Sequence, residues 1–194
     1  MNVLVSGGAS SGKSEYAEKI AVDLNGGLKN SGLFYVATMD KNSGGDTKER
    51  ILRHRKLRKG KGFKTVEMMF SGEKIDLFLS DDDIPYEDGN FCSENATVLL
   101  EDMGNLVARV VFSGRNCDYF RVISDFLLDL ERKSRNLVIV TNEIFLDEID
   151  LSDVHMRNYC EILAKANAFF AGISQKIVQI VAGIPLELSC ESKQ

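Results

Sequence analysis

Short apolar runs alternate along the chain with longer amphipathic or charged stretches, and this alternation predicts the secondary structure. Strands are predicted where the runs are short and rich in β-branched or aliphatic residues, at 2–6, 33–38, 63–67, 97–100, 137–141 and 176–182. Helices are predicted at 13–24, 46–59, 103–112, 118–133 and 152–172, the last capped by Ser152 or Asp153. The stretch 72–95 is acidic and irregular, with Asp81, Asp82 and Asp83 in a row, and is interpreted as a solvated loop.

The order of these elements predicts an α/β fold. Strands that alternate with helices imply a mostly parallel sheet with helices on both faces. The length of 194 residues suits one domain, here 1–194. Right-handed crossovers would place the carboxyl ends of the strands along one edge of the sheet, where ligands bind. Three polar segments follow predicted strands there, at 7–14, 101–102 and 141–143.

The first polar segment satisfies the pattern GxxxxGK[ST] between a predicted strand and a predicted helix; its residues are Gly7, Gly8, Ala9, Ser10, Ser11, Gly12, Lys13 and Ser14. Such glycines let backbone N–H groups point at phosphate oxygens, and the helix N-terminus adds the positive end of its dipole. Lys13, expected to face solvent in the empty loop, should reach the β- and γ-phosphates. These features predict a nucleoside triphosphate site; the alternative is a chance glycine-rich turn.

A magnesium ion at this loop would need a carboxylate as well as the Ser14 hydroxyl. Glu101 and Asp102 follow the run TVLL, where a Walker B acid would stand. Asp102 also suits the N-cap of the next helix, so each residue can hold one of the two roles. The sequence therefore predicts Mg²⁺ bound by Ser14 and Glu101.

Composition narrows the class of protein. A net charge of −5 argues against nucleic acid as the main partner. Zinc is improbable, because the four cysteines form no CxxC pair and no histidine cluster accompanies them. The start MNVLVSGG does not read as a signal peptide, and no apolar run reaches the roughly 18–20 residues that span a bilayer. We expect a cytoplasmic protein with free thiols.

The helix at 46–59 carries one of the two histidines, His54, while the other is His155. Arg50, His54 and Arg58 recur every four residues and so share one helix face. Repulsion from these arginines would favour the neutral, nucleophilic imidazole, and the same charges could neutralise a phosphate under attack. The alternative is a basic surface helix without chemistry.

Several motifs together resemble the bifunctional adenosylcobinamide kinase / adenosylcobinamide-phosphate guanylyltransferase family of cobalamin biosynthesis. They are GGASSGKSEYAE, YVAT, RILRHRKLR followed by FKTVE, LLED at 99–102 and VTNE at 140–143, and they cover most of the chain in order. The resemblance implies a RecA-like P-loop NTPase fold, a trimer, and two reactions. One moves the γ-phosphate of GTP or ATP to a hydroxyl of adenosylcobinamide. The other moves GMP from GTP, through a histidine, to adenosylcobinamide phosphate.

The resemblance also assigns residues. His54 falls on the guanylylated histidine, and residues 7–14 fall on the triphosphate loop. Positions expected to line the guanine nucleotide site are Ala37, Thr38, Met39, Arg55, Lys56, Leu57, Arg58, Glu67 and Glu101. The histidine helix would close over the nucleotide, with loops at 42–45 and 60–62 allowing the motion.

The chain departs from the family pattern after the histidine helix, after Asp102, after Glu143 and near Asn167. These departures spare residues 7–14 and His54, and they fall where a second substrate or a neighbouring subunit would be met. Two alternatives therefore stay open: a small-molecule kinase without guanylyltransferase activity, and a diverged nucleotide-binding relative without catalysis.

Overall fold

The protein is described here from a computed structural model that covers residues 1–26, 32–39, 45–71, 73–79, 95–145, 149 and 152–188. Its strands are β1 (Asn2–Gly7), β2 (Leu33–Ala37), β3 (Lys64–Ser71), β4 (Lys74–Leu79), β5 (Thr97–Glu101), β6 (Asn136–Asn142), β7 (Lys176–Val181) and β8 (Ile184–Leu188). Its helices are α1 (Lys13–Asn25), α2 (Gly45–Arg58), α3 (Met103–Val111), α4 (Tyr119–Arg132) and α5 (Val154–Ile173).

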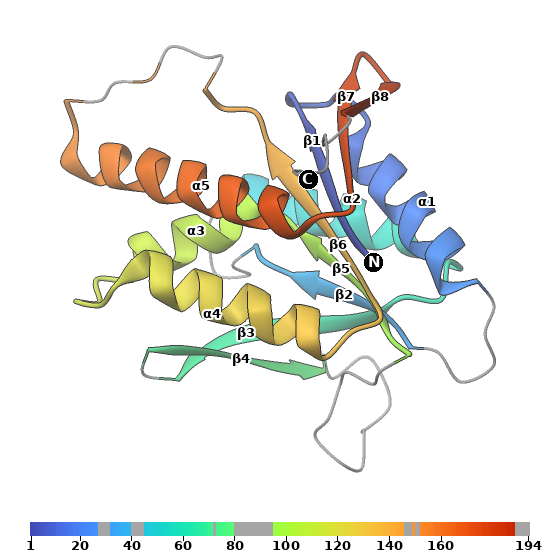
Figure 1. Ribbon diagram of the computed structural model, residues 1–194, viewed down its shortest axis with the longest axis horizontal. Coiled ribbons are helices and arrows are strands. Elements are labelled where there is room, and N and C mark those ends of the chain that lie inside the picture. Colours follow the sequence, from blue (N-terminus) through green and yellow to red (C-terminus); the bar gives the residue numbers. More distant parts are fainter. Residues whose placement is uncertain are drawn as a thin grey trace, which may run out of the picture.

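All of these strands belong to one eight-stranded sheet with the order β4-β3-β2-β5-β6-β1-β7-β8 (Figure 1). The inner strands pair in parallel, and β4 and β8 run antiparallel at the two edges. The predicted α/β fold with a mostly parallel sheet is confirmed. Strand β1, which leads into the glycine loop, lies in the interior of the sheet, and β6 separates it from β5.

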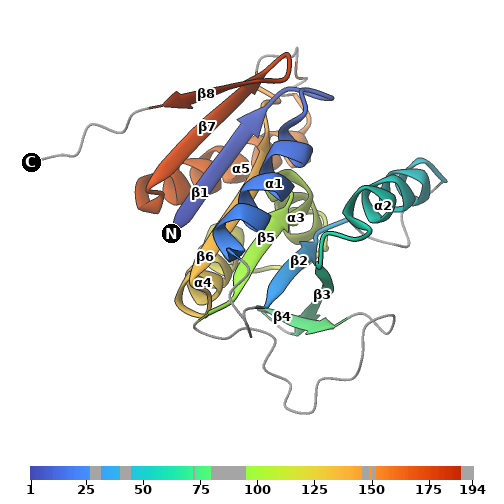
Figure 2. The ribbon, with the colours of Figure 1, turned by 90° about the vertical axis from the view of Figure 1, so that its right-hand side faces the viewer.

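Helices cover both faces of the sheet because alternate residues of each buried strand point to opposite sides. Val3 and Val5 of β1 pack in the same cluster as Ala17 and Ala21 of α1. Leu4 packs on the other face, in a larger cluster with residues of α3, α4 and α5. Figure 2 shows α1 in front of the sheet and α4 and α5 behind it, while α2 stands off to one side, near the end of β2.

Both edge strands were missed by the hydrophobic pattern. The loop predicted at 72–95 is wrong over β4, whose residues KIDLFL are alternately exposed and half-buried beside β3. All five residues of β8 are exposed, so a prediction that relies on buried apolar runs does not find this strand. An edge strand is stabilised by pairing with one neighbour and needs little burial, which explains both misses. Asp81, Asp82 and Asp83 lie outside the described residues.

Other local expectations hold. Asp153, not Ser152, caps α5, because its carboxylate accepts a hydrogen bond from the backbone N–H of His155. Cys117 and Cys160 are free thiols, while Cys92 and Cys190 lie outside the described part of the chain. Within the described ranges, no helix combines the length and apolar character that a membrane span requires.

Candidate active site

The glycine loop leaves the end of β1 and turns directly into α1. Ser10 and Gly12 adopt positive φ angles of 57° and 92°, and Gly12 is the N-cap of α1. The loop is held from two sides, since the backbone N–H of Glu143 donates to Gly7 O at 3.1 Å and that of Gly183 donates to Ser11 O at 3.0 Å. The curled backbone followed by a helix N-terminus is the geometry that binds phosphate.

Lys13 does not face solvent, as the sequence led us to expect. Its side chain folds back over the loop, where Nζ donates a 2.9 Å hydrogen bond to Gly8 O, and only 7% of the residue is exposed. The carbonyl of Gly8 gives the ammonium group a charge-assisted hydrogen bond inside the loop. Lys13 thus already lies across the loop in which the phosphates would bind.

Glu101 ends β5 with its side chain buried beside the loop. The side chain of Ser14 hydrogen-bonds to it, so the two predicted metal ligands lie together. Burial, with smaller contributions from the charges of Asp102 and Glu18, raises the pKa of Glu101 from 4.5 to about 7. Among the described residues, no group hydrogen-bonds to Glu101 Oε2. A buried carboxylate oxygen of this kind can coordinate a cation.

Asp102 has the other role predicted for this pair of acids. Its Oδ1 accepts the backbone N–H of Asn105 at 2.7 Å and so caps α3. Its Oδ2 accepts hydrogen bonds from the side chains of Asn105 at 3.1 Å and Asn142 at 3.0 Å. These bonds tie the ends of β5 and β6 together and fix the backbone from which Glu101 projects.

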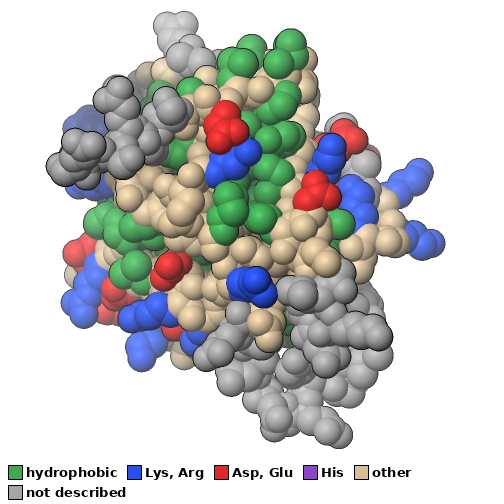
Figure 3. All heavy atoms as spheres, turned by 45° about the vertical axis from the view of Figure 1, so that its right-hand side comes forward, with side chains coloured by type: hydrophobic (Ala, Val, Ile, Leu, Met, Phe, Trp, Pro, Cys, Tyr) green, Lys and Arg blue, Asp and Glu red, His purple; other side chains and the backbone are tan. Residues whose placement is uncertain are grey.

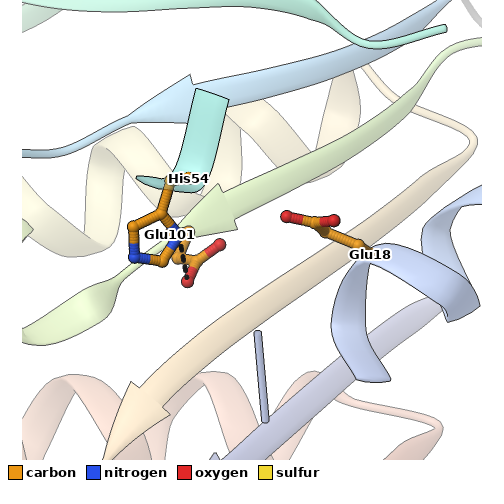
Figure 4. Close-up of side chains that lie close together, drawn as sticks. All are labelled: Glu18, His54 and Glu101. Atoms are coloured by element: carbon orange, nitrogen blue, oxygen red, sulfur yellow. Dashed lines mark ion pairs between the residues drawn. The ribbon is translucent and has the colours of Figure 1, made fainter. Parts of the chain in front are cut away.

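His54 reaches Glu101 from α2. Its Nδ1 lies 3.5 Å from Glu101 Oε1, and 17% of the side chain is exposed (Figure 4). Ser14, Glu101 and His54 therefore form a continuous link from the glycine loop to the histidine helix. The expected closure of α2 over the nucleotide is not needed to bring His54 to the carboxylate beside the loop.

The structure describes one of the two arginine side chains that were expected to share the helix face of His54. Arg58 stacks over the ring of Tyr35, with its guanidinium carbon 3.3 Å from the ring centroid. The side chain of Arg50 is not among those described. The structure places the carboxylate of Glu101 beside the imidazole.

Glu18 is a third member of this cluster and was not singled out in the sequence. It projects from α1 towards Glu101 and is 1% exposed (Figure 4). One potential ligand atom from each of Glu18, His54 and Glu101 lies within 4.8 Å of the others. Lys61 forms a 2.5 Å ion pair with Glu18. The available clue was helical spacing, because Glu18 follows Ser14 by four residues and so shares its helix face.

A cavity of about 250 Å³ opens beside His54, at the carboxyl end of β2 and along the first half of β3. The strand register explains why this cavity lies beside Glu101. Ala37 of β2 pairs with Glu67 of β3 on one side and with Glu101 of β5 on the other. Its lining includes His54 and the predicted Ala37, Thr38, Met39, Arg55, Arg58 and Glu67, together with Tyr35, Ile51, Thr65, Met68 and Arg109. Lys56 is exposed and is not part of this lining, and the side chain of Leu57 is not described.

A phosphate loop on an interior parallel strand, facing an acid at the end of a second strand, defines a P-loop nucleotide-binding protein. The chain belongs to the cobinamide kinase / cobinamide phosphate guanyltransferase family, whose model matches residues 3–188. This membership confirms the resemblance and makes the protein a transferase of cobalamin biosynthesis, with kinase and guanylyltransferase activities on cobinamide and nucleoside triphosphates as substrates. A comparison with curated proteins found no match.

Proposed function

We propose that both transfers use one site, in which residues 7–14 hold the triphosphate and His54 carries GMP between substrates. The observation that supports this is the link Ser14–Glu101–His54, because one carboxylate contacts both the loop and the histidine. The substrates would be adenosylcobinamide and adenosylcobinamide phosphate, as the family resemblance implies.

In the kinase step, an oxygen of the cobinamide hydroxyl attacks the γ-phosphorus of the triphosphate. The bond from that phosphorus to the bridging oxygen breaks, the nucleoside diphosphate leaves with the electron pair, and the hydroxyl proton is lost. Lys13 would neutralise charge near the β- and γ-phosphates, a role that its hydrogen bond to Gly8 O within the loop supports. Ser14 and Glu101 supply hard oxygen donors that fit Mg²⁺, which when bound would polarise the phosphoryl oxygens.

In the guanylyl step, Glu101 would orient the imidazole. When Glu101 is ionised, its carboxylate beside Nδ1 favours the tautomer with its proton on Nδ1, which leaves the lone pair of Nε2 for attack. Nε2 bonds to the α-phosphorus of GTP and pyrophosphate leaves with the electron pair of the broken P–O bond. A phosphate oxygen of cobinamide phosphate then attacks the same phosphorus, and the P–N bond returns its electron pair to His54.

The test is incubation with α-labelled GTP and Mg²⁺. We expect acid-labile, base-stable label on the protein, as a phosphoramidate requires. His54→Ala should eliminate the label while phosphorylation of cobinamide continues, because that step needs no nucleophilic histidine. His155→Ala, at the exposed start of α5, is the matched control and should label normally. Label on the His54→Ala protein contradicts the assignment, and kinase activity without label on the native protein supports the kinase-only alternative.

We also propose that the protein is a homo-oligomer, a trimer by family resemblance. The β7–β8 hairpin carries four exposed apolar side chains, those of Val181, Ile184, Leu186 and Leu188. Apolar side chains gather in the upper part of the face in Figure 3, where this hairpin lies. Such a patch on an edge strand suits contact between copies. Ile184→Asp should lower the molar mass measured by light scattering; an unchanged mass would place the interface elsewhere.

Free thiols at Cys117 and Cys160 support our further proposal that the protein works in the reducing cytoplasm. Cell fractionation checks this, and recovery outside the cytoplasmic fraction would contradict it.

A further inference from the structure

We propose that a second hollow, formed by β3 and α3 beside the nucleotide cavity, binds the corrinoid macrocycle of the cobinamide substrates. This hollow has a volume of about 420 Å³ and is lined by Thr38, Phe70, Asn105, Ala108, Arg109, Phe112 and Ser113. Thr38 and Arg109 also line the nucleotide cavity, so the two spaces meet at these residues. A substrate in the second hollow would therefore have its reacting end near His54.

The lining suits a large flat ring with apolar faces and an amide-bearing rim. Phe70, Ala108 and Phe112 offer apolar surface, while Asn105 and Ser113 offer amide and hydroxyl groups at the border. Phe112 is 53% exposed, yet its ring stacks on Tyr159 with centroids 6.0 Å apart. An exposed aromatic ring that a neighbour already holds in place can stack on a ligand at low entropic cost.

The charges at the hollow fit a phosphorylated substrate. Arg109 and Arg115 both lie over the ring of Phe70, with guanidinium carbons 5.3 Å and 5.0 Å from its centroid. Arg109 also donates to Met68 O at 3.2 Å, which fixes the guanidinium at the junction of the two spaces. A phosphate passing from the hollow towards His54 would meet this positive charge.

Asn105, near the start of α3, supplies an amide to the wall of this hollow. With the macrocycle bound there, the phosphate oxygen of the cobinamide phosphate attacks the guanylyl phosphorus, forming the P–O–P bond as the P–N bond to His54 breaks.

This inference rests on the proposed role of His54, and the experiment separates the two half-reactions. Phe112→Ala should form the guanylyl-enzyme from α-labelled GTP as the native protein does, because no corrinoid takes part in that step. The cobinamide phosphate concentration needed for half-maximal discharge of the label should rise roughly 10-fold or more, since a stacking surface is lost. The KM for cobinamide in the kinase reaction should rise with it.

Phe145→Ala is the matched control, because Phe145 is 48% exposed and lines neither space. It should discharge its label at native concentrations. Arg109→Gln should raise the KM for cobinamide phosphate more than that for cobinamide, since only the former carries the phosphate. Unchanged discharge in Phe112→Ala, or an equal loss in Phe145→Ala, would overturn the corrinoid site. If no guanylyl-enzyme forms at all, the His54 mechanism fails, and the KM for cobinamide alone decides the corrinoid site.

Discussion

At the scale of single residues, Glu101 is a buried acid that the fold keeps partly protonated. The folded-state pKa of about 7 lies above the ordinary value of 4.5, chiefly because burial disfavours the charge. Between these pH values the folded protein holds a proton that the unfolded chain has released. The free energy of unfolding should therefore fall as pH rises from 4.5 through 7, by about 3 kcal/mol in all.

Glu101→Gln removes this titrating group, so the free energy of unfolding of the variant should change less with pH than that of the native protein. Denaturant titrations at pH 5 and pH 8, without nucleotide or divalent cations, measure the difference. Glu161→Gln is the control, because Glu161 is exposed on α5, where it forms an ion pair with Lys165. If Glu101→Gln lost stability between pH 5 and pH 8 as steeply as the native protein, another group would be responsible.

Lys13 is the second residue whose environment leads to a prediction. Lys13→Ala removes the main positive charge from the loop, and we expect both transfers to slow by about 10²–10³-fold. Losing its bond to Gly8 O should cost about 1 kcal/mol of stability, because the bond is only partly buried and water can replace the lysine. Lys19→Ala, on the exposed side of the same helix, should affect neither quantity. Transfer rates within a few-fold of native in Lys13→Ala would remove this loop from the reaction centre.

At the scale of elements, the turn from β1 into α1 depends on the close approach of β7. A Cβ added at Gly7 would lie 2.8 Å from the backbone oxygen of Ile180 and 2.6 Å from Ser11 Oγ, so a strand or the loop would have to move. Gly7→Ala should therefore destabilise the protein by roughly 1–3 kcal/mol.

Gly8→Ala is the matched control, because a Cβ there meets no described atom within 4 Å. Its stability should stay within about 0.5 kcal/mol of native. Thermal or denaturant unfolding distinguishes the two variants. Equal stabilities would mean that β7 yields to the added methyl group.

What could be predicted from the sequence depended on how local the signal was. Residues 7–14 were found because strand, loop and helix follow one another, and Asp102 because a helix cap acts within one turn. Glu18 was missed because its helical spacing from Ser14 does not show that His54 of α2 and Glu101 of β5 come to lie beside it. Lys13 was placed wrongly because its partner, Gly8 O, becomes available only when the loop curls.

At the scale of the whole molecule, the sheet order creates the site. Strand β5 brings Glu101 to the loop across β6, and β2 and β3 bring the cavity lining alongside it. Arg109, which borders both spaces, comes from α3 on the face opposite α1. These residues come together through pairing between strands that are far apart in the sequence. The hydrophobic periodicity used to predict the elements does not specify which strands pair.

The interior position of β1 also has a consequence for biosynthesis. Both strands that pair with it, β6 and β7, follow it by more than a hundred residues, since Asn2 pairs beside Leu137 and Val3 beside Lys176. During translation, at about 5–20 residues per second, the apolar segment VLV leaves the ribosome long before a partner strand exists. The loop is thus completed only after β6 and β7 have been made, and β1 is open to chaperones in the interval. Ribosome-bound chains stalled before residue 136 should be cleaved readily by protease near β1, whereas chains that extend past residue 188 and have cleared the tunnel should be protected. Early protection would mean that β1 first pairs with another segment.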